Sequence, residues 1–283
     1  MSTDHARRAA VLGSPVDHSL SPVLHLSAYR ALGLPDWTYD RIEIDADGLP
    51  GFVDGLGPEW AGLSVTMPGK RAALAHATEV TPRAQAVGAA NTLVPVGDGW
   101  RADCTDVDGV TGALRVAGGY DGGTRAVVLG AGGTAAAAVV AFADLGVTSV
   151  RLVVREPARA GETTEAARRA GLDVDVLRWS EVDMAALTAD TDVLVSTVPS
   201  EALTADLEAI AGVGCVLDVI YHPWPTPLAD AVAARGGRIA TGLDMLLHQA
   251  FGQVEQFTGR TAPREEMRRA LREATGGVLE LPV

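Results

Sequence analysis

The sequence predicts an α/β protein: an N-terminal α/β domain, a second domain built on a doubly wound parallel sheet, and C-terminal helices that return to the first domain. Short apolar strands alternate with helices along most of the 283 residues. A strand, a glycine turn and a helix follow one another within residues 126–143. The helical stretches after Gly242 have no strand to follow. We expect domains at residues 1–108 with 243–283 and at residues 109–242.

The first domain is expected to alternate short strands with helices. A helix should run from Ser21 to Leu32, because Ser21 suits the N-cap and Pro22 the first helical position. Gly97 and Asp98 predict a hairpin. A helix over residues 107–116 and a glycine-rich linker then lead to the second domain. The expected strands are residues 9–13, 39–44, 63–67, 91–96 and 99–102, and the linker is residues 118–123.

In the second domain the alternation of strands and helices is typical of a parallel sheet. Residues 126–143 carry no charge and are about as long as a membrane span, yet their glycines and alanines favour a strand, a turn and a helix. Helices over residues 244–258 and 264–274 close the chain. The expected strands are residues 126–129, 150–154, 174–177, 193–196, 216–219 and 238–240.

Composition excludes several classes of function. A net charge of -13 argues against non-specific binding to nucleic acid or to an anionic membrane. Cys104 and Cys215 are the only cysteines, and their separation predicts neither a metal site nor a disulfide framework. A reducing cytoplasm is therefore the expected location, and the first ten residues show no signal peptide.

The glycine turn predicts a dinucleotide site. It follows an apolar strand and fits the pattern G-x-G-x-x-A, in which glycines allow a tight turn and let a pyrophosphate approach the helix N-terminus. This context predicts a Rossmann-type domain. The alternative is a turn that only packs a helix onto a sheet. The candidate cofactor residues of the turn are Gly130, Ala131, Gly132, Gly133 and Thr134.

The next strand predicts which cofactor binds. An acid at its end would hold the ribose hydroxyls of NAD, whereas an arginine suits the 2′-phosphate of NADP. Arg155 comes first, Glu156 follows, and Arg159 adds a second cation. NADP is therefore expected, and NAD is the alternative because Glu156 would repel a phosphate if it pointed inward.

Lys70 is the only lysine, against 22 arginines. A lysine ammonium can give up its proton, which arginine does not do in proteins. The residue stands where a predicted strand meets a helix, the edge at which α/β sheets place ligands. It is a candidate for a proton-handling step, and the alternative is an ordinary surface lysine.

Other polar residues also stand at the ends of short elements. Ser19 and Ser21 precede or open a helix and could bind a carboxylate, although Ser21 could equally be a plain helix cap. Asp106 near Lys70 would hold its ammonium group and tune both pKa values. Taken singly, Asn91 and Asp106 are most often turn or cap residues.

Seven motifs, in this order along the chain, together resemble those of the shikimate dehydrogenase family. The residues of several motifs resemble those of its actinobacterial branch. They cover nearly the whole chain and are residues 13–25 with Ser-x-Ser-Pro, 62–70, 88–93, Thr105-Asp106, 130–135, 218–228 and 242–251.

The resemblance implies reversible hydride transfer between NADPH and the ketone of 3-dehydroshikimate, giving shikimate for chorismate and aromatic amino acid biosynthesis. It implies that the first domain binds this small-molecule substrate, that no metal, nucleic acid or membrane takes part, and that the protein is a monomer or homodimer.

The same resemblance implies roles for single residues. Lys70 and Asp106 would form the catalytic pair. Ser19 and Ser21 would bind the substrate carboxylate. The remaining implied substrate residues are Thr66, Asn91 and Gln249, with Tyr221 nearby. Residues 130–134, Arg155 and Arg159 would hold NADP, and Val219 and Gly242 would line the nicotinamide end.

Some positions depart from the family pattern. Ser64 and Cys104 each replace an asparagine, and Glu156 stands beside Arg155. They leave open a dehydrogenase for quinate or an aminoshikimate, and one that uses NAD. A regulator that senses NADP without turnover, and a methylene-tetrahydrofolate-type dehydrogenase, are further alternatives. Intact Lys70 and Asp106 argue against the regulator, and Ser-x-Ser-Pro argues against the folate enzyme.

Overall fold

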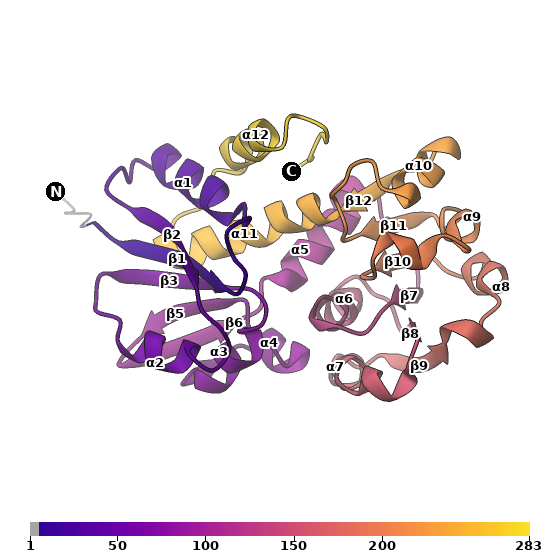
Figure 1. The fold of residues 1–283 in the computed structure, drawn as a ribbon, viewed down its shortest axis with the longest axis horizontal. Coiled ribbons are helices and arrows are strands. Elements are labelled where there is room, and N and C mark those ends of the chain that lie inside the picture. The colour runs from indigo at the N-terminus through magenta and orange to yellow at the C-terminus, as the bar shows by residue number, and fades with distance from the viewer. Residues whose placement is uncertain (1–5) are drawn as a thin grey trace. The chain divides into compact units, whose positions relative to one another are not determined.

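The computed structural model describes residues 6–283, and they form two compact units (Figure 1). The first unit runs to Thr105 and resumes over Gln249–Leu281; the second is Asp106–His248. Each unit contains one six-stranded sheet with helices around it. The α/β prediction is confirmed, and the domain boundaries expected from the sequence stay a prediction.

The first sheet is mixed, in the order β2-β1-β3-β5-β6-β4. β1 pairs in parallel with β2 and β3, and β5 pairs antiparallel with β3 and β6. The strands are β1 (Arg8–Gly13), β2 (Thr38–Glu43), β3 (Trp60–Val65), β4 (Glu79–Val80), β5 (Thr92–Val96) and β6 (Gly99–Asp103).

Strand β1, which lies between β2 and β3, is buried on both faces. Successive side chains of a strand point to opposite faces. Ala9 and Val11 accordingly join one apolar cluster with Tyr39, while Ala10 and Leu12 join another with Leu63. Helices must therefore cover both faces of this sheet.

The helices of the first unit include the returning C-terminal pair. α12 (Arg264–Ala274) packs against α1 (Ser21–Ala31), and α11 (Gly242–Thr258) enters the unit at Gln249. The first helix begins with Leu20 at its N-cap, so the expectation that Ser21 caps it is wrong. The others are α2 (Leu49–Asp54), α3 (Lys70–His76) and α4 (Pro82–Val87).

The second sheet is parallel throughout, in the order β12-β11-β10-β7-β8-β9. The chain order reverses between β7 and β10, the kind of position where doubly wound sheets bind ligands. The strands are β7 (Arg125–Leu129), β8 (Ser149–Val154), β9 (Asp173–Arg178), β10 (Val193–Ser196), β11 (Cys215–Asp218) and β12 (Ile239–Thr241).

The charge-free segment is a buried strand and helix. Helix α6 (Gly133–Asp144) buries every side chain from Ala135 to Phe142, which explains its lack of charge. Within residues 6–283, no helix has the length and hydropathy of a membrane span. The other helices of the unit are α5 (Asp106–Gly112), α7 (Gly161–Arg169), α8 (Met184–Ala189), α9 (Leu207–Ile210) and α10 (Pro227–Ala234).

Residues 118–123 do not link the two units, contrary to expectation, because they lie inside the second. The Asp192 carboxylate accepts the N–H groups of Thr124 and Arg125 at 2.8 and 2.9 Å. A side chain at Gly123 would overlap Asp192. These glycines therefore fit a tightly packed approach to β7.

Gly62 in β3 tests the packing of the returning helix. A Cβ there would overlap the ring of Phe257 in α11, so we expect Gly62→Ala to lower the free energy of unfolding by about 2 kcal/mol. Gly51→Ala in α2 is the control, because no atom lies within 4 Å of its added Cβ. Urea unfolding would measure both, and equal midpoints for the two variants would contradict the packing argument.

Candidate active site

Two loops lie side by side at the carboxyl edge of the first sheet. The N–H of Ser14 donates to the carbonyl of Met67 at 3.0 Å, and a side chain at Gly13 would overlap Thr66. The loop that leads to Ser19 thus starts beside the loop that carries Thr66.

Lys70 is the first residue of α3 and is partly buried. Its carbonyl accepts the N–H of Ala90 at 2.9 Å, and Asn91 follows directly. The backbone therefore brings the strand-to-helix turn of Lys70 next to the start of β5.

The two serines are held by backbone and side-chain bonds. Arg41 donates to the carbonyl of Ser19 at 2.6 and 2.9 Å, and the N–H of Ser21 donates to Ser19 Oγ at 3.3 Å. The Tyr39 hydroxyl donates to Ser64 Oγ at 2.6 Å and also hydrogen-bonds with Ser21. Burial raises the pKa of Tyr39 well above its usual value, although both serine bonds oppose the shift.

Asn91 holds the turn that precedes Asp106. Its Oδ1 accepts the Thr105 N–H at 2.8 Å and the Thr92 hydroxyl at 2.8 Å. Its Nδ2 donates to Thr105 Oγ1 at 3.0 Å and to Gln249 Oε1 at 3.2 Å. The structure thus brings Asn91 and Gln249, two of the expected substrate residues, into contact.

Gln253 lies one helical turn after Gln249 and also bonds to this cluster. Its Nε2 donates to the carbonyl of Asn91 and to Thr92 Oγ1, both at 3.0 Å. Its Oε1 accepts from Ser64 Oγ at 2.8 Å and from His25 Nε2 at 3.3 Å. The backbone carbonyl of Asn91 can only accept a hydrogen bond, so the group of Gln253 that faces it must be the NH2. This bond fixes the orientation of the Gln253 amide.

His25 completes the cluster as a neutral group. It is fully buried and stacks on Tyr39, with ring centroids 4.1 Å apart. Burial lowers the pKa of His25 to about 3, which its bond to Gln253 only partly offsets. The imidazole therefore stays uncharged at neutral pH and donates from Nε2.

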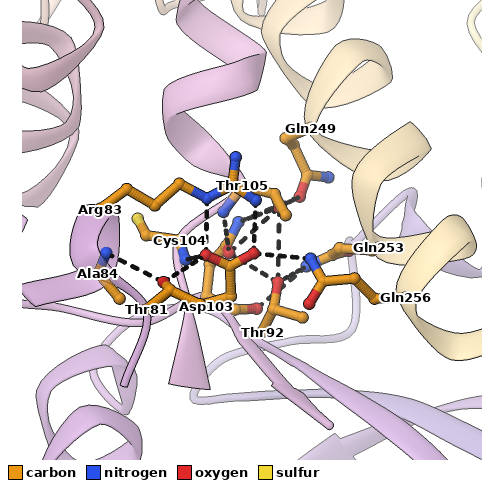
Figure 2. A network of polar contacts seen from close by, with 11 residues as sticks. Thr81, Arg83, Ala84, Thr92, Asp103, Cys104, Thr105, Gln249, Gln253 and Gln256 are labelled. Atoms are coloured by element: carbon orange, nitrogen blue, oxygen red, sulfur yellow. Dashed lines mark hydrogen bonds and ion pairs between the residues drawn. The ribbon is translucent and has the colours of Figure 1, made fainter. Parts of the chain in front are cut away.

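A buried carboxylate anchors the other side of the turn (Figure 2). Asp103 accepts from Thr81 Oγ1 at 2.7 Å, from the Cys104 N–H at 2.8 Å and from Gln256 Nε2 at 2.7 Å. Both oxygens also pair with Arg83. Burial alone would raise the pKa of Asp103, but the bonds from Arg83, Thr81 and Cys104 outweigh it and lower the value to about 2.

Asp106 itself begins α5 and is buried. It follows Thr105 directly, so the bonds that hold Thr105 also fix the start of this helix. Lys70 belongs to the first unit and Asp106 to the second, and their pairing stays a prediction.

The glycine turn of the second unit suits a pyrophosphate. Gly130 has a φ of +103°, which few other residues adopt, and α6 begins just after Gly132. No atom lies within 4 Å of a Cβ added at Gly132 or Gly133. The backbone is therefore open beside the N–H groups of a helix N-terminus, and these residues fit a dinucleotide.

Val219, Tyr221 and Gly242 also come together in the second unit. A Cβ at Gly242 would overlap the carbonyl of Val219 and reach within 2.8 Å of the Tyr221 ring. The loop is held by Asp218, whose carboxylate accepts from the Ile220 N–H at 3.1 Å and from Thr226 at 2.9 Å. Only glycine permits this approach of the loop to α11.

Local sequence patterns do not predict the buried partners of the site. Tyr39, His25 and Gln253 make bonds that join residues far apart in the chain. One signal was readable: Gln249 and Gln253 stand four residues apart on one face of a predicted helix.

Comparisons with known proteins agree on one family. A model described as "Shikimate dehydrogenase substrate binding domain" matches residues 11–93, and one described as "Shikimate 5'-dehydrogenase C-terminal domain" matches residues 242–272.

Individual relatives are similar over nearly the whole chain. "Shikimate dehydrogenase (NADP(+))" of Methylobacterium radiotolerans is 37% identical and covers 94% of this chain and 95% of its own. The crystal structure of Mycobacterium tuberculosis shikimate dehydrogenase is 54% identical, with a TM-score of 0.88, covering 94% and 99%. The Thermus thermophilus enzyme in complex with NADP(H) and shikimate is 32% identical, with a TM-score of 0.78, covering 95% and 99%.

The charge of Asp103 should stabilise the protein in a pH-dependent way. Because its pKa is lower in the folded chain, its contribution is full above about pH 4 and is lost as the pH falls towards 2. We expect Asp103→Asn to lower the free energy of unfolding by about 2 kcal/mol at pH 7. The difference in the free energy of unfolding between wild type and Asp103→Asn should shrink as the pH falls towards 2. Denaturant unfolding at several pH values measures this difference. A difference that does not change with pH would contradict the lowered pKa of Asp103.

Proposed function

This chain belongs to the shikimate dehydrogenase family, and we propose that it is the NADP-dependent oxidoreductase that reversibly reduces 3-dehydroshikimate to shikimate. The observation that carries the proposal is the gathering of carboxylate- and hydroxyl-binding groups at one edge of the first sheet. The loops of Ser19 and Thr66 adjoin there, and Lys70 is bonded beside Asn91. Shikimate has one carboxylate and several hydroxyls, which such a set can hold.

We assign the substrate to the first domain, residues 1–108 with 243–283, and NADP to residues 109–242. Ser19 and Ser21 bind the carboxylate through their hydroxyl groups. Thr66, Asn91 and Gln249 bind hydroxyls, with Tyr221 as a further contact. Asn91 and Gln249 are supported for this role by bonds that fix their amides before any ligand arrives.

The cofactor supplies the two electrons of the reduction when it is bound. Residues 130–134 hold its pyrophosphate, Arg155 and Arg159 its 2′-phosphate, and Val219 and Gly242 its nicotinamide end. Reduction of a ketone places negative charge on the substrate oxygen. The Lys70 ammonium stabilises that charge and donates the proton. Asp106 orients Lys70 and accepts a hydrogen bond from a neighbouring substrate hydroxyl.

A cytoplasmic location and a monomeric or homodimeric state stay predictions. The location rests on the cysteine content, and sedimentation of the purified chain would measure the oligomeric state.

Absorbance of the reduced nicotinamide tests the function directly. Purified protein is mixed with shikimate or quinate, and with NADP or NAD, in four parallel reactions. We expect the fastest reduction with shikimate and NADP. Reduction confined to quinate or NAD would overturn the specificity, and no reduction in any mixture would favour a regulator that binds NADP without turnover.

Lys70→Met should lower kcat by about 10²–10⁴-fold and change KM little, because the other substrate contacts remain. Lys70→Arg should also lower kcat, since arginine keeps the charge and does not release the proton. Arg71→Met, which removes the exposed cation next in the chain, should behave as wild type in steady-state assays. A near-normal kcat for Lys70→Met would remove Lys70 from the chemistry.

A further inference from the structure

An acidic residue stands among arginines at the carboxyl edge of the second sheet. Strand β8 ends at Val154, followed by Arg155 and Glu156, and β9 ends at Arg178. Val154 and Arg178 are direct neighbours in the parallel register. In this fold the adenosine ribose lies at the end of the second strand of the sheet, which here is β8. The side chains of Glu156 and Arg178 therefore leave the sheet where the ribose would bind.

Arg178 makes three contacts there. Its Nη2 lies 3.5 Å from Oε1 of Glu156, and its Nη1 donates to the carbonyl of Arg155 at 3.3 Å. Its Nε lies 3.5 Å from Oε1 of Glu181. One guanidinium thus bonds the backbone after β8 and pairs with the acid that interrupts the arginines.

The pairing changes what this edge can bind. An unpaired carboxylate beside the ribose accepts a hydrogen bond from a 2′-hydroxyl and repels a 2′-phosphate. Paired with a guanidinium, the same carboxylate contributes little net field. Glu156 and Arg178 remain 53% and 39% exposed, so solvent screens the effect, and its size should be moderate.

We propose that Arg178 determines cofactor specificity: by holding Glu156 in an ion pair, it allows the second unit to accept a 2′-phosphorylated adenosine. This inference rests on the NADP preference proposed above. Arg178 is a positioning residue, because it acts through Glu156 and not through the reacting atoms.

The test is binding of adenosine 2′,5′-bisphosphate and of 5′-AMP, measured by titration calorimetry without turnover. The proteins are wild type, Arg178→Ala, Glu156→Gln and the double variant. We expect Arg178→Ala to weaken bisphosphate binding about three- to tenfold and AMP binding less than twofold. Glu156→Gln should restore bisphosphate binding in the Arg178→Ala background, because residue 156, which directly follows Arg155, then carries no charge to repel the phosphate.

Arg235→Ala is the matched control. Arg235 pairs with Glu208 at the same distance, 3.5 Å, and is similarly exposed. It directly follows α10, which leads into β12. Strand β12 is the outermost strand on the side of the sheet opposite to β9. This variant should bind both nucleotides as wild type does.

Each contrary outcome has a definite meaning. Equal weakening of both nucleotides by Arg178→Ala would show a structural role and overturn the inference. Failure of Glu156→Gln to restore binding would overturn it as well. If wild type bound AMP as tightly as the bisphosphate, the NADP assignment and the inference would both be wrong. If Arg178→Ala kept the wild-type preference for the bisphosphate over AMP, the inference about Arg178 would be wrong and the NADP assignment would stand.

Discussion

The hydrogen bonds of Asn91 hold in place the edge of the first sheet where the substrate is proposed to bind. Buried polar groups are costly unless they are paired, and Asn91 is 3% exposed. Its amide pairs with Thr105 and Gln249, and its carbonyl with Gln253. The last two belong to α11, so the first sheet needs the returning helix to satisfy its own polar core. The returning helix thus supplies partners for both the side-chain amide and the carbonyl of a buried residue.

The two units handle polar groups differently. In the first, amides and hydroxyls are buried and fixed by one another, and neutral His25 keeps the donor directions constant around neutral pH. In the second, the arginines at the sheet edge are exposed and interact through charge. Salt screens exposed charges far more than buried hydrogen bonds. We therefore expect substrate recognition in the first unit to depend on shape and donor direction, and cofactor recognition at the arginine edge to depend on ionic strength.

Local sequence patterns predict the helices and strands, but they do not predict contacts between residues far apart in the chain. The glycine turn, the parallel sheet and the position of Lys70 at the start of a helix follow from neighbouring residues alone. Ser21 is inside α1 and hydrogen-bonds with Tyr39 of β2, a long-range partner that the local cap pattern does not predict. Glu156 was judged by its neighbours in sequence, whereas Arg178 reaches it from the adjacent strand. The loop at residues 118–123 resembled a linker because its glycines gave no sign of the packing against Asp192.

The scarcity of lysine has a practical consequence for chemistry on this protein. Lys70 is the only side-chain amine, and it is partly buried at the first turn of α3. Reagents that acylate primary amines ordinarily scatter over many surface lysines. Here they have one side chain to modify, and it stands at the edge of the sheet where the substrate is proposed to bind. A single side-chain reporter can thus be placed at that edge of the natural chain without any substitution, leaving only the α-amine as a further primary amine.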